Sequence, residues 1–351
     1  MFNEKEENDL RKSAPAGAAK AKSYNDYRRL IKWISARLAI AIAAIILAGG
    51  VYQFVATKID ERKYPTPGKM VDIGGQRLHL HCTGEGERTV ILEAGLGGGV
   101  LDWSLVQPEL ARFTRVCSYD RSGTGWSEAG TQLRNAEQIV RELHSLLERA
   151  EIKPPFILVG HSIGGVYVQL YSRRYPDEVA AMVLVDSSHE DQFSRKELPK
   201  PSPVYPVLIK ALAPLGVGRL IFQLKETSEN VSPELAAEMA SVYSRTGHLY
   251  AVADELAQIP EGLAQLRNST MEPDGKPLIV LSQGRPREDL EAEKAWAELQ
   301  ADLTRRSTNS QKIVARNSGH YIQFDEPDLV ISSIRQLIQN RSSRDFAVPQ
   351  R

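Results

Sequence analysis

The sequence has few cysteines, no excess of either charge and no internal repeat. Its 351 residues contain two cysteines, Cys82 and Cys117, and neither belongs to a CxxC pair. This pattern excludes a disulfide-dependent scaffold, and we expect no metal site. The 44 Lys and Arg residues equal the 44 Asp and Glu residues. The charge therefore gives no reason to expect nucleic acid as a partner.

One stretch near the N-terminus lacks charged residues altogether. Residues 38–56 carry none. A helix of this length rises about 28 Å, close to the thickness of the hydrocarbon core of a bilayer. We predict a transmembrane signal anchor at 38–56, a disordered basic tail at 1–37 and a linker at 57–68. A cleaved signal peptide ending near the small residues 48–50, or a buried soluble helix, are the alternatives.

The basic residues around this stretch are unevenly distributed. Between Lys20 and Arg37 there are six basic residues and one acidic residue, whereas Lys58, Arg62 and Lys63 are partly balanced by acidic neighbours. An excess of Lys and Arg on one side of a span marks the cytoplasmic side. We therefore predict a cytoplasmic N-terminus and a folded domain on the outer side of the membrane.

Apolar runs of strand length alternate with helical patterns along the folded part. After a hairpin at 70–82 with a Gly-Gly turn, strands are expected at 89–93, 115–119, 156–160, 180–185, 278–281 and 312–315, and helices at 135–150, 164–175, 290–303 and 329–339. Such alternation is typical of a mainly parallel sheet with helices on both faces, an α/β fold. We assign the core to 69–189 and 276–345, and an inserted helical cap to 190–275.

A GxSxG segment, Gly160-His161-Ser162-Ile163-Gly164, joins one of these strands to a helix. A sharp strand-to-helix turn exposes the serine hydroxyl above the sheet edge, and small neighbours make room for that turn. A serine hydroxyl is a weak nucleophile and requires a base. We predict Ser162 as the nucleophile and His320, which follows the last strand, as the base.

An oxyanion hole requires backbone N–H groups directed at the developing negative charge. One is expected from Ile163, the residue after the serine. The second is expected from the loop after the strand at 89–93, where Gly95-Leu96 fits with Leu96 supplying the N–H. The glycines of this loop allow the backbone to approach a substrate closely.

These residues resemble those of the α/β-hydrolase family, in its order of oxyanion loop, serine, acid and histidine. The resemblance covers about residues 69–340, and the segment 120–127 is similar to the family's DRxGxGxS segment, which braces the floor of the site. The chain has Ala94-Gly95 where many members have His-Gly. The resemblance implies a serine hydrolase that works through an acyl-enzyme and uses no metal or cofactor.

The acid of the triad has two candidates. The usual family position follows the strand at 278–281, where Asp289 comes one or two places late and also suits a helix cap. Some members carry the acid on the neighbouring strand, whose end here is Asp186. We favour Asp186 and keep Asp289 as the alternative.

The resemblance also bears on the two cysteines. In this fold the second hairpin strand lies beside the strand after the oxyanion loop, which would place Cys82 near Cys117. Two separate core thiols and a cross-strand disulfide are both open; the disulfide needs the oxidising side of the membrane.

The expected activity is carboxylic ester hydrolysis on a small-molecule or lipid ester. A peptidase or acyltransferase of the same fold remains open, as does a catalytically idle membrane-held binding protein. We interpret the apolar residues of 203–222 as cap core, with an acyl pocket or a lipid-binding surface as the alternatives.

Overall fold

A computed structural model describes residues 24–224, 228–269, 274–286 and 289–339. The chain divides into two compact units, residues 1–49 and 50–351. Helix α2, Tyr24–Lys63, extends across that boundary. Residues 24–37 and 57–63 are therefore helical, whereas we expected a disordered tail and a linker there. The first 23 residues of the predicted tail lie outside the described residues.

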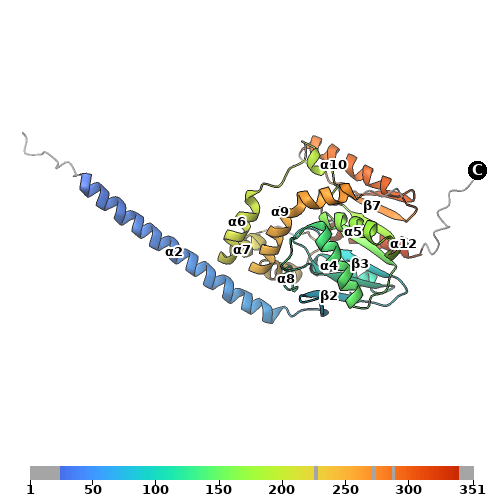
Figure 1. Ribbon diagram of the computed structural model, residues 1–351, viewed down its shortest axis with the longest axis horizontal. Coiled ribbons are helices and arrows are strands. Elements are labelled where there is room, and N and C mark those ends of the chain that lie inside the picture. The colour runs from blue at the N-terminus through green and yellow to red at the C-terminus, as the bar shows by residue number, and fades with distance from the viewer. Residues whose placement is uncertain (1–23, 225–227, 270–273, 287–288, 340–351) are drawn as a thin grey trace, which may run out of the picture. The chain divides into compact units, whose positions relative to one another are not determined.

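The larger unit is built on an eight-stranded sheet (Figure 1). Its strands are β1 (Lys69–Asp72), β2 (Arg77–Thr83), β3 (Thr89–Glu93), β4 (Arg115–Tyr119), β5 (Phe156–His161), β6 (Val179–Val185), β7 (Leu278–Gln283) and β8 (Ser310–Ala315). They lie in the order β1-β2-β4-β3-β5-β6-β7-β8. The predicted hairpin forms β1 and β2, which pair antiparallel, as do β2 and β4; all other pairs are parallel.

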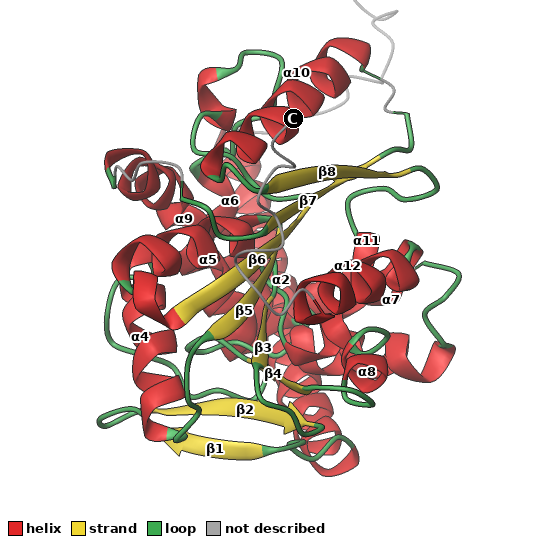
Figure 2. Ribbon diagram, turned by 90° about the vertical axis from the view of Figure 1, so that its right-hand side faces the viewer, coloured by secondary structure: helices red, strands yellow, loops and turns green. Residues whose placement is uncertain are grey.

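Helices cover both faces of the sheet. The helices that follow α2 are α3 (Gln107–Leu110), α4 (Ala136–Arg149), α5 (Ile163–Arg174), α6 (Val204–Leu212), α7 (Val217–Leu224), α8 (Pro233–Tyr243), α9 (Thr246–Asn268), α10 (Leu290–Asp302), α11 (Ile322–Asp325) and α12 (Pro327–Gln339). Figure 2 shows α4 and α5 on one side of the strands and α12 on the other. The fold is the α/β-hydrolase architecture expected from the sequence.

Side-chain alternation along the strands divides the core between the two faces. Ile91 and Leu158 belong to a hydrophobic cluster that includes residues of α4 and α5. Val90, Ile157 and Val159 belong to a second cluster, which includes residues of α3 and α12. Successive side chains of a strand point to opposite faces. Strands that are apolar at every position therefore bury both faces, which is why these short runs form the centre of a parallel sheet.

The order of the strands determines at which edge of the sheet a ligand site is expected. The chain passes from β3 outward to β4 and then returns to β5 on the other side of β3. In open α/β sheets, ligands bind at such a reversal, outside the carboxyl ends of the strands. Those ends carry the Gly95 loop after β3 and Ser162 after β5. The segment expected to form a cap contains α6, α7, α8 and α9.

Cys82 and Cys117 are cross-strand partners in the register of β2 with β4, and a disulfide joins them across a Cα–Cα distance of 4.0 Å. The sequence left open two separate thiols or a cross-strand disulfide, and the structure has the disulfide.

Candidate active site

Ser162 occupies a tight bend between β5 and α5. Its backbone has φ 54° and ψ −124°, a conformation that residues other than glycine rarely adopt. Its N–H donates to the carbonyl of Val185 over 3.1 Å, and its carbonyl accepts from the N–H of Ser188 over 2.9 Å. Strain at such a residue costs on the order of 1–3 kcal/mol and persists only where the surroundings impose it. These hydrogen bonds from the end of β6 impose it here.

The glycines of the elbow are required by space. A Cβ at Gly160 would lie 2.6 Å from the carbonyl oxygen of Gly164, and one at Gly164 would lie 2.5 Å from that of Ala94. Both distances are shorter than any real Cβ contact, so a side chain at either position would displace backbone. The GxSxG pattern is thus explained by close packing of the bend against the helix and the oxyanion loop.

The structure brings Ser162, His320 and Asp186 together. The Nε2 of His320 lies 3.0 Å from the Oγ of Ser162, and its Nδ1 lies 2.7 Å from Oδ2 of Asp186. The other oxygen of Asp186 accepts hydrogen bonds from Gln283 N–H, over 3.0 Å, and from Trp296 Nε1–H, over 2.9 Å. Asp186 is fully buried. A carboxylate on Nδ1 fixes the tautomer in which Nε2 is free to accept the serine proton.

The alternative acid, Asp289, has another structural role. Its Oδ1 accepts from the N–H groups of Glu291 and Ala292 over 3.0 and 3.1 Å, which makes it the N-cap of α10. The structure therefore does not bring Asp289 to the histidine. Gln283 and Trp296 were not predicted, because no sequence pattern associates an indole on a later helix with an aspartate 110 positions earlier.

The oxyanion loop lies against the elbow. A Cβ at Gly95 would meet Nδ1 of His161 at 2.9 Å and Cβ of Ser162 at 3.2 Å. Gly95, Leu96, Ser162 and His320 line one cavity of about 670 Å³, mostly apolar in its lining. Ile163 is buried at the start of α5. Of the two residues predicted to donate N–H groups, Leu96 lines the cavity with Ser162, and Ile163 directly follows Ser162 in the chain.

A buried ion network holds this loop in place. The guanidinium of Arg121 donates to the carbonyls of Ala94 and Gly95 over 2.8 and 2.7 Å. It also pairs with Glu93 at 2.6 Å and with Glu255 of α9 at 3.0 Å. All three charged side chains are nearly inaccessible to solvent. The segment 120–127 therefore braces the loop, as its resemblance implied, and also ties the loop to the cap.

His161 fixes the loop that carries the other histidine. One ring nitrogen, Nε2, lies 2.9 Å from the carbonyl oxygen of His320, and Nδ1 lies 3.3 Å from Nε2 of Gln323. Burial, and then the neighbouring His320, lowers the pKa of His161 to about 3. The ring is therefore neutral, donates from Nε2 and accepts at Nδ1. His161 therefore ties the backbone at His320 to the bend that carries Ser162.

Replacing Gly95 by alanine tests the fit of the loop. We expect kcat to fall about 100-fold, because a displacement of about 1 Å at the reacting groups has that effect. We also expect stability to fall by about 1–3 kcal/mol from overpacking. Steady-state kinetics and thermal unfolding measure the two effects. Gly247→Ala on α9 is the control, because a Cβ there meets nothing within 4 Å; unchanged kinetics in both variants would contradict the prediction.

The sequence match to a known family agrees with this geometry. A family model described as alpha/beta hydrolase fold matches residues 88–327. The chain belongs to the α/β-hydrolase family. It is an enzyme of this superfamily by fold and family membership, and the matched segment contains the elbow, the histidine and both candidate acids. Among the described residues no three His, Cys, Asp or Glu side chains are grouped to hold a metal ion.

Individual relatives of this α/β hydrolase are distant. It is 28% identical over 263 residues to the uncharacterized protein YqjL of Bacillus subtilis (strain 168), covering 75% of this chain and 88% of that one. Among solved structures, an enol-lactonase from Burkholderia xenovorans LB400 is 18% identical, with a TM-score of 0.61 and coverage of 77% and 99%. An esterase from Thermogutta terrifontis is 20% identical, with a TM-score of 0.57 and coverage of 78% and 98%. At these identities the structural likeness concerns the fold alone.

Proposed function

We propose that this α/β hydrolase is a membrane-anchored serine hydrolase that cleaves carboxylic esters through an acyl-enzyme. The observation that carries the proposal is the chain of contacts from Asp186 to His320 and from His320 to Ser162, at 2.7 and 3.0 Å. A nucleophile, its base and an orienting carboxylate in hydrogen-bond contact are the requirements for covalent acyl transfer.

The proposed reaction has two halves. His320 accepts the hydroxyl proton as Ser162 Oγ bonds to the acyl carbon, and the N–H groups of Leu96 and Ile163 stabilise the oxyanion. The tetrahedral intermediate expels the alkoxide, which takes the proton from His320. A water molecule then attacks the acyl carbon with His320 as base, and Ser162 leaves as the hydroxyl with the released acid. Asp186 stays ionised and stabilises the imidazolium.

An ester substrate is favoured by the cavity. Its lining is mainly apolar and includes Leu96, Phe222, Met239, Leu249 and Val252. Such a lining suits an acyl chain or another apolar acid moiety. The esterase and lactonase among the structural neighbours act on carboxylic esters by their names, which agrees with this substrate class.

A fluorophosphonate probe tests the proposed nucleophile. We expect the folded full-length chain to form one phosphonyl adduct, and peptide mapping should place it on Ser162. Heat-denatured protein should not react, because an unassisted serine is a weak nucleophile. A folded chain that remains unlabelled, or an adduct on another serine, would contradict the proposal and favour a binding protein on a hydrolase scaffold.

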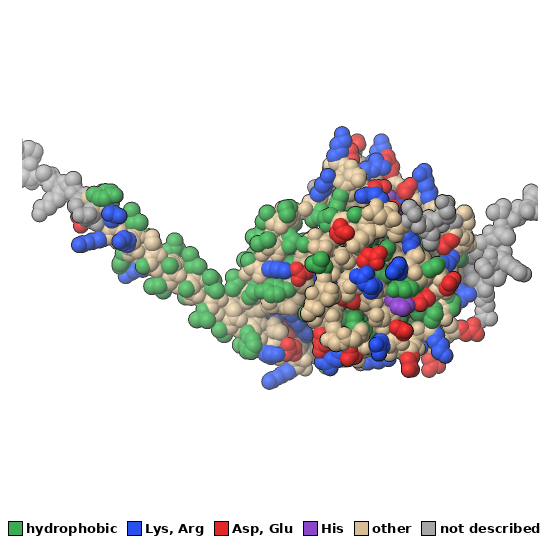
Figure 3. Space-filling model, viewed as in Figure 1, with side chains coloured by type: hydrophobic (Ala, Val, Ile, Leu, Met, Phe, Trp, Pro, Cys, Tyr) green, Lys and Arg blue, Asp and Glu red, His purple; other side chains and the backbone are tan. Residues whose placement is uncertain are grey.

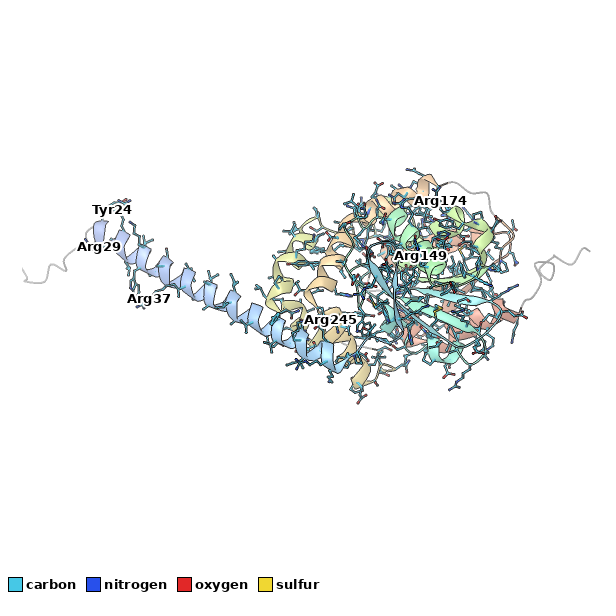
Figure 4. All side chains as sticks on the ribbon, turned by 60° about the horizontal axis from the view of Figure 1, so that its bottom comes forward. Tyr24, Arg29, Arg37, Arg149, Arg174 and Arg245 are labelled. Carbon is cyan, nitrogen blue, oxygen red and sulfur yellow. A yellow bond between two sulfur atoms is a disulfide. The ribbon has the colours of Figure 1, made fainter. Side chains whose placement is uncertain are left out.

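We further propose that α2 anchors the enzyme with its N-terminus in the cytoplasm. By length and composition, the helix is long and apolar enough to cross a membrane. Figure 4 shows Arg29 and Arg37 on the N-terminal part of α2. Basic residues on that side support a cytoplasmic N-terminus. The disulfide between Cys82 and Cys117 supports the same orientation, because such bonds persist in oxidising compartments.

Thiol alkylation after expression in cells tests this orientation. Acid-quenched, denatured full-length protein should add no maleimide reagent without reductant and two after reduction. Cys82→Ser is the matched control and should add one reagent in both cases. Two additions before reduction would place the domain in a reducing compartment and contradict the predicted topology. Release of the uncleaved chain by carbonate would contradict the anchor.

A further inference from the structure

The cap carries an apolar surface that the proposed reaction does not use. Helices α6 and α7 meet at a bend of 98°. Eight large apolar side chains on them are between 39% and 84% exposed, and we call this set the α6–α7 face: Val204, Tyr205, Val207, Leu208, Leu212, Leu220, Ile221 and Leu224. Figure 3 shows hydrophobic side chains gathered over this part of the cap. The interpretation of residues 203–222 as cap core is therefore wrong for Val204, Val207, Leu208 and Leu212, which are exposed.

The charges of this segment are neutralised. Between residues 203 and 224 the chain has two charged residues, Lys210 and Arg219. Lys210 pairs with Asp254 of α9, and Arg219 is buried in an ion pair with Asp60 of α2. Of these two charges, that of Lys210 reaches the surface, where Lys210 and Asp254 are 44% and 50% exposed as a pair, whereas Arg219 is buried.

The α6–α7 face lies beside the C-terminal end of the uncharged stretch of α2. Gln53, almost fully buried, donates from Nε2 to the carbonyl of Ser244 over 2.8 Å. A Cβ on Gly216, between the two cap helices, would lie 2.9 Å from the ring of Tyr52. Along the helix axis, these contacts lie within about 6 Å of Ala56, the last residue of the predicted span, at 1.5 Å per residue. The end of the proposed anchor that belongs to the larger unit therefore packs against the cap.

Helix α7 also forms a wall of the cavity. Phe222 lines the cavity that contains Ser162, whereas Leu220, Ile221 and Leu224 of the same helix are exposed. A Cβ on Gly218 would lie 2.5 Å from Cδ1 of Leu249, another lining residue, so α7 packs closely on α9. One short helix therefore separates the exposed apolar surface from the site.

We propose that the α6–α7 face lies in the interfacial zone of the bilayer and that the substrate is an ester carried in that bilayer, which enters the cavity past α7. The inference rests on the proposed anchor and ester hydrolysis. A bilayer is the occupant favoured because residues 52–60, at the C-terminal end of the proposed anchor and within the larger unit, pack on this side of the cap. Amphipathic helices without charge on their apolar side bury that side about 5–10 Å into the boundary between headgroups and acyl chains.

Depth-dependent quenching tests the location. Full-length protein carrying Ile221→Cys is labelled with a nitrobenzoxadiazole maleimide and reconstituted into phosphatidylcholine vesicles containing nitroxide-labelled lipids. We expect strong quenching at position 221. Leu133→Cys, an equally exposed apolar position in a loop before α4, is the matched control and should be quenched little. Equal quenching at both positions, or protection of 221 from lipid in a dimer detected by cross-linking, would overturn the proposal.

Kinetics with two substrates separates this inference from the proposed function. The double variant Val207→Glu with Ile221→Glu should hydrolyse a water-soluble short-chain p-nitrophenyl ester at the wild-type rate. Its rate on a long-chain monoacyl ester in vesicles should fall about tenfold, because charges at the interface oppose insertion. Leu133→Glu should leave both rates unchanged. Equal rates of the double variant and wild type on the vesicle ester would overturn the inference alone, whereas absence of soluble-ester hydrolysis in wild type would overturn the proposed function.

Discussion

Replacing Ser162 by alanine is expected to lower kcat for ester hydrolysis by about 10⁶-fold. The reason is the loss of the covalent route: without Oγ at 3.0 Å from Nε2 of His320, no acyl-enzyme forms. Water could attack only with help from the oxyanion hole and substrate binding, which leave a residual acceleration of about 10³–10⁴ over the uncatalysed rate. Substrate binding itself should change little. Single-turnover and steady-state kinetics on a p-nitrophenyl ester measure both quantities.

The controls for Ser162→Ala separate nucleophile loss from misfolding. Ser332→Ala, on α12 with its hydroxyl bonded to the carbonyl of Leu329, should retain full activity. His320→Ala should lose about as much as Ser162→Ala, and the double variant should be no slower than either single variant, because the two residues act as one unit. Additive losses in the double variant would contradict direct proton transfer between them.

The sheet was predictable because local and global signals agree in it. The runs at 156–160 and 180–185 are apolar at nearly every position, which suits only strands with two covered faces, and they form β5 and β6. The bend at Ser162 was equally accessible, since Gly160 reflects its contact with Gly164, four residues later, whereas Gly164 reflects the closeness of Ala94 in a distant loop. Where a structural requirement is local, the residue that meets it is visible in the sequence.

Long-range polar pairs that no sequence motif marks were not predictable. The contact of Arg121 with Glu255 joins residues 134 positions apart, and each alone resembles an ordinary charged residue. Asp60, near the end of α2, likewise pairs with Arg219, 159 positions away. Apolar periodicity carries no information about such partners. The pairing of Cys82 with Cys117 needed the register of β2 with β4, which the cysteine count does not contain.

The choice between Asp186 and Asp289 also depends on contacts that the sequence does not specify. Replacing the acid of the triad is expected to have the second large effect on kcat. Spacing along the chain placed Asp186 and Asp289 each near the end of a strand, and only the fold separates them. Asp186→Asn should lower kcat about 10⁴-fold, because an amide at that position favours the wrong tautomer of His320. Asp289→Asn should leave kcat within about twofold, since asparagine also caps helices.

Variants at Asp186 and at Asp289 should also differ in their effects on the labelling of Ser162 and on stability. Asp186→Asn keeps the size of a buried side chain, so labelling of Ser162 by a fluorophosphonate should slow in parallel with kcat while the protein stays folded. Asp289→Ala should reduce stability by about 1 kcal/mol through loss of the cap on α10, with kcat retained. Circular dichroism checks that the variants are folded, thermal unfolding measures the stability, and steady-state kinetics measures kcat. A large loss of kcat in Asp289→Asn, with Asp186→Asn near wild type, would reassign the carboxylate and require the β7–α10 loop to rearrange before catalysis.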